Sequence, residues 1–175
     1  MFIAYFVFGI FALRHFGVQA SISLTIEEAT IDTIDPKYFD PKNSYIHLDE
    51  EAGDSVTIQL TAIKELPERC FGHFTVFGLS MGAFIKPSGL DVGMKLCDMI
   101  EQPLVGEFLR KLGLTGKACP VQPGTYRAER YRLSPESLPD RYDENKYETK
   151  FDLSVDGKAI LTAKTIVEVA NLYDR

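Results

Sequence analysis

The sequence is poor in the residues on which most catalytic and metal sites depend. Its 175 residues include no Trp, three Cys and three His, and no His follows His73. So few scattered His and Cys do not form the clustered ligand set of a zinc site. The glycine-rich loops that cradle phosphates and dinucleotides are also absent. The sequence therefore predicts no catalytic residue, no metal site and no cofactor, and we expect the protein not to be an enzyme.

Positive charge is also scarce. Lys and Arg total 19 against 25 Asp and Glu, which gives a net charge of −6 and a pI near 5.1. An acidic chain is a poor binder of a phosphate backbone, so a nucleic-acid partner is not expected. A polybasic membrane anchor is excluded for the same reason. With 45% apolar and 25% charged residues, the composition is that of one ordinary globular domain.

One enzyme-like motif is present but incomplete. The segment 78–82 has the G-x-S-x-G spacing of a hydrolase nucleophile, which requires a helix after the Ser and a His later in the chain. Pro87 soon interrupts any such helix, and the later His is missing. We therefore expect a strand end or loop here, with His47 on the surface and His73 packed or hydrogen-bonded within a strand.

The first twenty residues form the one long apolar run. Residues 2–13 are twelve consecutive apolar residues, and Val18-Gln19-Ala20 suits a signal peptidase. A membrane-spanning helix needs about 20 apolar residues, so an uncleaved anchor or an interfacial helix is the weaker alternative. The sequence thus predicts a signal peptide over 1–20 and a secreted, extracellular domain over 21–175 without stable membrane insertion.

Secretion changes the interpretation of the three cysteines, because thiols tend to pair in an oxidising compartment. Three cysteines allow one intramolecular bridge and leave one thiol over. Cys97 and Cys119 flank an expected helix and a Gly-rich turn, and the loop between them is short and easy to close. Cys70 lies in an apolar strand and is expected to be a buried free thiol, with a bond to a partner chain as the alternative.

Most of the remaining sequence alternates with the two-residue period of half-buried strands. The expected strands cover 23–31, 45–48, 56–62, 69–79, 125–133, 147–155 and 158–169. The last two are joined by Asp156-Gly157, a strong hairpin turn. Because both faces of 69–79 are apolar, that strand is expected to be buried on both sides.

The segment 91–112 changes to a helical period. Leu104, Phe108 and Leu112 recur at a spacing of four, behind Pro103 and ahead of Gly113. This pattern predicts one helix between Pro103 and Gly113. Together these segments predict an all-β fold, an antiparallel β-sandwich or β-cup of about seven or eight strands with one short helical insertion.

A basic and aromatic cluster occupies the strand 125–133. On a regular strand Tyr126, Arg130 and Arg132 would share one face. That face is either a solvated surface or, since Arg forks suit phosphate and carboxylate groups, a headgroup contact at a pocket mouth. The sequence leaves both interpretations open.

The second half of the chain carries a recognisable order of motifs. Three segments follow one another along the chain. They are Leu96-Cys97-Asp98-Met99-Ile100, then Phe108-Leu109-Arg110-Lys111-Leu112-Gly113-Leu114, then Cys119-Pro120-Val121-Gln122-Pro123-Gly124-Thr125-Tyr126. This order, completed by the last hairpin, resembles the ganglioside-activator branch of the ML (lipid-recognition) superfamily. It is equally similar to the insect chemosensory CheA/CheB group. The resemblance covers about residues 91–170, and the chain lacks the further cysteines of the ganglioside activator.

The resemblance implies a Cys97–Cys119 disulfide and a β-cup whose apolar cavity holds acyl chains, with the helix near its mouth. The candidate cavity residues are apolar positions of the strands and the helix. They are Phe74, Phe77, Phe84, Leu104, Phe108, Leu112, Phe151, Leu153 and Val167. We therefore expect a secreted, non-enzymatic binder of a lipid or hydrophobic signal molecule. The alternative is a secreted interaction module with a filled core, acting on a receptor or hydrolase.

Overall fold

The computed structural model describes residues 21–49, 55–116, 119–133 and 143–172. The predicted signal peptide therefore lies outside the described residues. The strands are β1 (Ser21–Ile34), β2 (Tyr45–Leu48), β3 (Ser55–Ala62), β4 (Phe71–Ser80), β5 (Ala83–Lys95), β6 (Gly124–Arg132), β7 (Asn145–Val155) and β8 (Lys158–Leu172). The helices are α1 (Leu96–Met99) and α2 (Pro103–Lys111).

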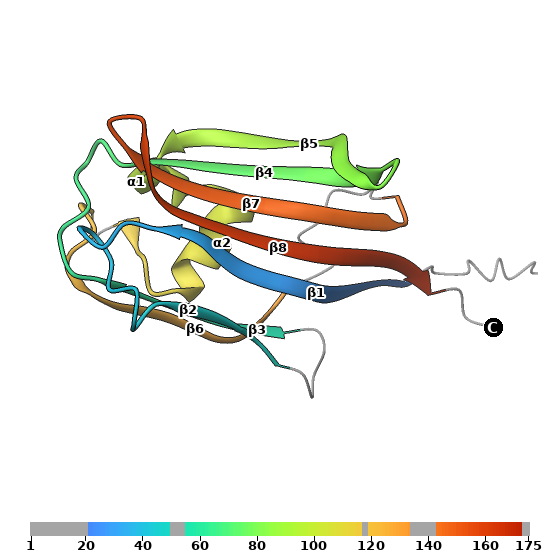
Figure 1. Cartoon of the computed structure of the whole chain (residues 1–175), viewed down its shortest axis with the longest axis horizontal. Helices are drawn as coiled ribbons and strands as arrows, with labels where there is room; N and C mark the ends of the chain where they lie inside the picture. The colour runs from blue at the N-terminus through green and yellow to red at the C-terminus, as the bar shows by residue number, and fades with distance from the viewer. Residues whose placement is uncertain (1–20, 50–54, 117–118, 134–142, 173–175) are drawn as a thin grey trace, which may run out of the picture.

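The strands form two antiparallel sheets that face each other. The larger sheet has the order β1-β8-β7-β4-β5, and the smaller has the order β2-β3-β6. In Figure 1 the large sheet is the upper layer, the small sheet is the lower layer, and α2 is seen between them. This arrangement confirms the expected all-β sandwich with a short helical insertion.

The β7–β8 hairpin follows the sequence pattern closely. Asp156 and Gly157 both have positive φ, at 52° and 75°, as a tight two-residue hairpin turn requires. The turn places Val155 opposite Lys158, and a register shift between Leu153 and Ser154 sets the pairing of the rest of the hairpin. Beyond that shift the inner face carries the odd-numbered residues of β7 and, from Leu161 on, those of β8.

β5 differs from the expectation drawn from the sequence. The helical period was expected to begin at Asp91, whereas the structure continues as a strand through Lys95. Asp91 lies opposite Thr75 of β4, and Pro87 lies opposite Phe77. β5 is an edge strand, where a proline is tolerated because its missing N–H would face away from the sheet.

β4 is not buried on both faces, and that expectation was wrong. Phe71, on its outer face, is 42% exposed, because nothing described covers this side of the large sheet. Phe77 shares that outer face and is half-buried. Val76 is buried on the inner face, which faces the small sheet and α2.

α2 begins and ends where its sequence predicts. Pro103 occupies the first turn, and Gly113, just beyond the last residues of the helix, has a φ of +94°. The Cys97–Cys119 disulfide is present, with 5.9 Å between the two Cα atoms. It ties α1 to the segment that leads into β6. Cys70 is a buried free thiol, as expected.

β6 contains a bulge that changes which face its arginines occupy. Val56 of β3 lies opposite Tyr131, but Ile58 lies opposite Ala128, so β6 accommodates one extra residue between them. Arg130 has a φ of +46° within this bulge. The bulge puts Tyr131 on the inner face with Ala128, and leaves Arg130 exposed.

The apolar side chains between the layers form two clusters. The larger joins both sheets to the helices and includes the fully buried Met99, Ile100, Leu109 and Leu161. The smaller consists of Val76, Tyr147 and Val169, with partly buried neighbours. Among the described residues, no helix is long and apolar enough to cross a membrane.

Candidate ligand cavity

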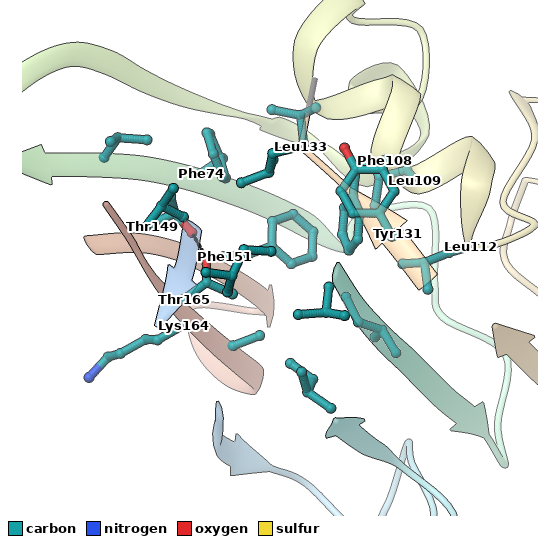
Figure 2. Close-up of a pocket in the computed structure, with 18 of the residues that line it drawn as sticks. Phe74, Phe108, Leu109, Leu112, Tyr131, Leu133, Thr149, Phe151, Lys164 and Thr165 are labelled. Atoms are coloured by element: carbon teal, nitrogen blue, oxygen red, sulfur yellow. Dashed lines mark hydrogen bonds between the residues drawn. The ribbon is translucent and has the colours of Figure 1, made fainter. Parts of the chain in front are cut away.

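A cavity of about 180 Å³ lies between the two sheets and is partly open to solvent. Most of its wall comes from β1, β3, β4, β7, β8 and α2, with single residues from β2, β5 and β6. The residues drawn in Figure 2 show that apolar side chains converge on it from both layers. Few voids larger than a water molecule occur in protein interiors, so a hollow of this size is unusual.

The large sheet supplies the widest wall. Phe151 and Leu153 of β7 point inward, with Ala163 and Leu161 directly opposite them on β8. Phe74 of β4 lies opposite Phe151 and extends this wall. These side chains share one face because alternate residues of a strand point the same way.

α2 and the small sheet supply the other walls. α2 and its C-terminal cap contribute Val105, Phe108, Leu109 and Leu112. The small sheet contributes Ile46, Val56, Ile58, Leu60 and Tyr131. Leu109 and Leu112 are almost fully buried, which fixes the helix against the core. The half-buried Phe108 is thereby held against the cavity.

Six of the residues predicted from the sequence line the cavity. They are Phe74, Phe108, Leu112, Phe151, Leu153 and Val167. Phe77 and Phe84 do not line it, and those assignments were wrong. Phe77 lies on the outer face of β4, and Phe84 lies on the edge strand β5 opposite Leu79. The Leu104 side chain lies outside the described part of the structure.

Sequence reasoning missed the polar members of the lining. Tyr131, Thr149 and Thr165 all border the cavity. The Asp156-Gly157 turn alone would place Thr149 opposite Lys164, and a register shift between Leu153 and Ser154 makes Thr165 its partner instead. The inward orientation of Tyr131 likewise depends on the bulge in β6. Neither irregularity is evident from the sequence.

Arg130 and Arg132 do not line the apolar cavity, and this does not favour their interpretation as headgroup contacts. They border a separate depression, open to solvent, with Glu107, Lys111 and Glu129. Arg130 also pairs with Asp49 at 3.7 Å, and its side chain is 82% exposed. The depression mixes both signs of charge, which favours the interpretation of a solvated surface. Tyr131 borders both spaces.

Charge is nearly absent from the cavity. Lys164 borders it, but the Lys164 ammonium is bound to the carboxylate of Asp32 at 2.6 Å. That hydrogen bond raises the pKa of Lys164 and lowers the pKa of Asp32. Burial raises the pKa of the Tyr131 phenol, and Glu107 adds to this shift. The lining is therefore uncharged at neutral pH except for a lysine already neutralised by its partner.

The enzyme-like motif takes the form of a hairpin. Ser80 ends β4, and β5 begins at Ala83, so no helix follows the serine. The Nε2–H of His73 donates a hydrogen bond of 2.7 Å to the Asp91 carboxylate on the exposed outer face of the same sheet. Within the described ranges, no group of three His, Cys, Asp or Glu side chains is placed to hold a metal ion.

Comparison with protein-family models finds no match to this chain, and comparison with curated proteins finds none either.

Proposed function

We propose that this protein is a secreted, non-enzymatic carrier of a lipid or lipid-like signal molecule, held between its two sheets. The observation that carries the proposal is the unfilled apolar cavity of about 180 Å³. The side chains that line such a space lack van der Waals partners on one side and leave apolar surface in contact with water. A ligand that fills the space would supply those contacts and remove that surface from water.

The cavity size favours a slender ligand. It exceeds the engineered apolar cavity of about 150 Å³ that binds benzene, but is smaller than the roughly 300–1,000 Å³ of drug-sized sites. A single alkyl chain fits these limits better than a lipid with several chains. The order of motifs shared with the ML superfamily supports the same class of ligand.

Secretion is supported by two independent features. Residues 1–20 have the pattern of a signal peptide. The Cys97–Cys119 disulfide is a bond that persists in oxidising compartments. A chemosensory role is consistent with a secreted binder of hydrophobic molecules and rests on the resemblance alone.

Native mass spectrometry of the protein purified from secreting cells tests the proposal. We expect an added mass that is lost on denaturation and recovered by organic extraction. Ala163→Leu, which places extra atoms in the cavity wall, should reduce the bound fraction. The matched variant Ala83→Leu, at an exposed position on β5, should not. No co-purifying lipid and no binding of fatty acids or hydrocarbons at micromolar concentration would refute a carrier.

The second candidate is a protein-interaction module. It is favoured by exposed apolar side chains on β4, β5 and their turn: Phe71 at 42%, Ile85 at 60% and Met81 at 100%. The cavity argues against an interaction module whose core is completely filled by side chains. This candidate replaces the carrier if the purified protein neither contains nor binds a hydrophobic molecule.

A further inference from the structure

Two hydroxyl groups interrupt the apolar wall of the cavity. Thr149 of β7 and Thr165 of β8 lie opposite each other, and their Oγ1 atoms are 2.5 Å apart. Both side chains border the cavity and are half-buried. Figure 2 shows the pair beside Phe151, with Phe108 and Leu112 of α2 at the other end of the view.

The fold does not depend on these hydroxyls. Valine has the same branched shape as threonine and suits a strand equally well, without a polar group to desolvate. A polar pair can serve to fix a strand register, but the apolar pairs Phe151–Ala163 and Leu153–Leu161 on the same inner face already favour this register of β7 and β8. A Val–Val pair would therefore be the expected choice for a wall that only had to pack.

The pair has unused hydrogen-bonding capacity. Each hydroxyl has one proton and two lone pairs, and the bond between them uses only one proton. Among the described residues, neither hydroxyl has a second hydrogen-bond partner. One O–H donor and several lone pairs thus remain available to a molecule in the cavity.

The surroundings favour a neutral polar group over a charged one. The Lys164 ammonium is bound by Asp32, and in Figure 2 its side chain extends away from Phe151 and Phe108. No other Lys, Arg or His belongs to the described lining. A carboxylate in this cavity would lose its hydration without gaining a cation, which is strongly unfavourable.

We propose that the Thr149–Thr165 hydroxyl pair is the polar anchor of the cavity, and that the ligand is a neutral single-chain amphiphile. Its hydrogen-bond acceptor, such as a ketone, ester or alcohol oxygen, accepts the free O–H of the pair while its alkyl chain packs against Phe74, Phe108 and Phe151. This inference rests on the proposed function, because it specifies the ligand of the same cavity.

The test compares three ten-carbon probes: decane, 2-decanone and ionised decanoate. Each competes with the fluorescent probe N-phenyl-1-naphthylamine for the cavity. The variant Thr149→Val with Thr165→Val removes both hydroxyls and preserves the shape of the wall. The matched control, Thr75→Val, alters a buried threonine on the outer face of β4 that does not border the cavity.

We expect the double variant to bind 2-decanone roughly fivefold more weakly, since one neutral hydrogen bond is lost. Decane should bind the double variant as tightly as the unmodified protein, or more tightly. Thr75→Val should change the affinity for neither 2-decanone nor decane. Decanoate should bind the unmodified protein more weakly than 2-decanone does. The infrared carbonyl stretch of bound 2-decanone should lie at lower frequency in the unmodified protein than in the double variant.

Two results would overturn the inference in different ways. If all the probes bind but the double substitution weakens the binding of 2-decanone no more than that of decane, the anchor is wrong while the carrier function stands. Tighter binding of decanoate than of 2-decanone would likewise reject a neutral ligand. If none of the probes binds, the proposed function itself fails, and the anchor fails with it.

Discussion

The ring of Phe108 on α2 meets the ring of Tyr131 on β6 edge to face, with the centroids 5.3 Å apart and the planes at 62°. Such a pair contributes about 0.5–1.5 kcal/mol beyond the area it buries. Both rings border the cavity, so the contact joins the helix to the small sheet at the edge of the ligand space. The two walls of the cavity are thus held together by residues that a ligand would touch.

Replacing Phe108 should therefore affect binding more than folding. We expect Phe108→Ala to weaken the affinity for N-phenyl-1-naphthylamine by about tenfold, because loss of a ring contact removes at least about 1.4 kcal/mol of apolar burial. Phe77→Ala, which removes the same ring from the outer face of β4, should leave the affinity unchanged. Fluorescence titration measures both, and thermal unfolding monitors the folded fraction. Equal losses of affinity in the two variants would contradict a cavity site.

The disulfide should contribute a large part of the stability. Cys97 and Cys119 are 22 positions apart, and closing a loop of this length stabilises the folded state by about 3 kcal/mol. We expect the double variant Cys97→Ser with Cys119→Ser to unfold at a correspondingly lower urea concentration. Reductant should destabilise the unmodified protein and leave the double variant unaffected. A reductant effect of the same size in both proteins would argue against this role of the bridge.

Cys70 should make the protein less stable at alkaline pH. Burial raises the pKa of the Cys70 thiol from 9.0 to about 11, because the charged thiolate is poorly solvated in the core. Between these values the unfolded chain loses the proton more readily than the folded one. Stability should thus fall as the pH rises above 9, by at most about 1.4 kcal/mol per pH unit.

The comparison that isolates this effect is urea unfolding of the unmodified protein and Cys70→Ala over that pH range. Above pH 9 the free energy of unfolding should fall less steeply with pH in the variant, because the contribution of Cys70 is absent and those of other groups remain. The native thiol should also resist iodoacetamide until denaturant is added. Rapid labelling of the folded protein would contradict its burial.

Asp35 should stabilise the fold down to acid pH. Its carboxylate accepts the backbone N–H of Lys37 at 2.9 Å and the Lys158 ammonium at 3.0 Å, and these bonds lower the pKa of Asp35 below 3.8. The stabilisation is present above the unfolded pKa and is lost as the pH falls through the lower folded value. Asp35→Asn should be less stable than the unmodified protein at neutral pH, and the difference should shrink in acid. An unchanged difference across the acid range would exclude this linkage.

Gly106 should resist replacement although it lies inside a helix. Helix propensity alone favours alanine over glycine by about 1 kcal/mol. However, a Cβ at Gly106 would crowd the carbonyl group of Ile100, with its carbon only 2.8 Å away. We expect Gly106→Ala to lower the melting temperature, whereas Gly124→Ala, where no atom lies within 4 Å, should not lower it comparably. A gain in stability for Gly106→Ala would show that the two helices can separate at little cost.

Local patterns were sufficient for several elements of the fold. Pro103 and Gly113 delimit α2, and Asp156-Gly157 fixes the last hairpin, because each signal acts within a few residues. The β5 strand was missed, since an edge strand tolerates Pro87 and need not bury a regular face. Its assignment depends on pairing with β4, which local sequence does not encode.

The cavity was predictable only in part. Both faces of β4 are apolar in the sequence, so alternation did not identify which of Phe74 and Phe77 points inward. That choice depends on where the small sheet packs. In β6 a one-residue bulge reversed the expected sides of Tyr131 and Arg130, and such a bulge leaves little trace in composition. The threonine pair became visible only once the register of two strands was known.

The pairing of β1 with β8 has a consequence for biogenesis. β1 pairs with β8 alone in the large sheet, with Ser21 opposite Leu172. Of the described strands, the first to be synthesised therefore gains its partner in the large sheet only after the last has been made, and until then it is an unpaired edge that invites aggregation. Maturation of this protein should be post-translational, and its yield should depend on chaperones that shield β1 during synthesis.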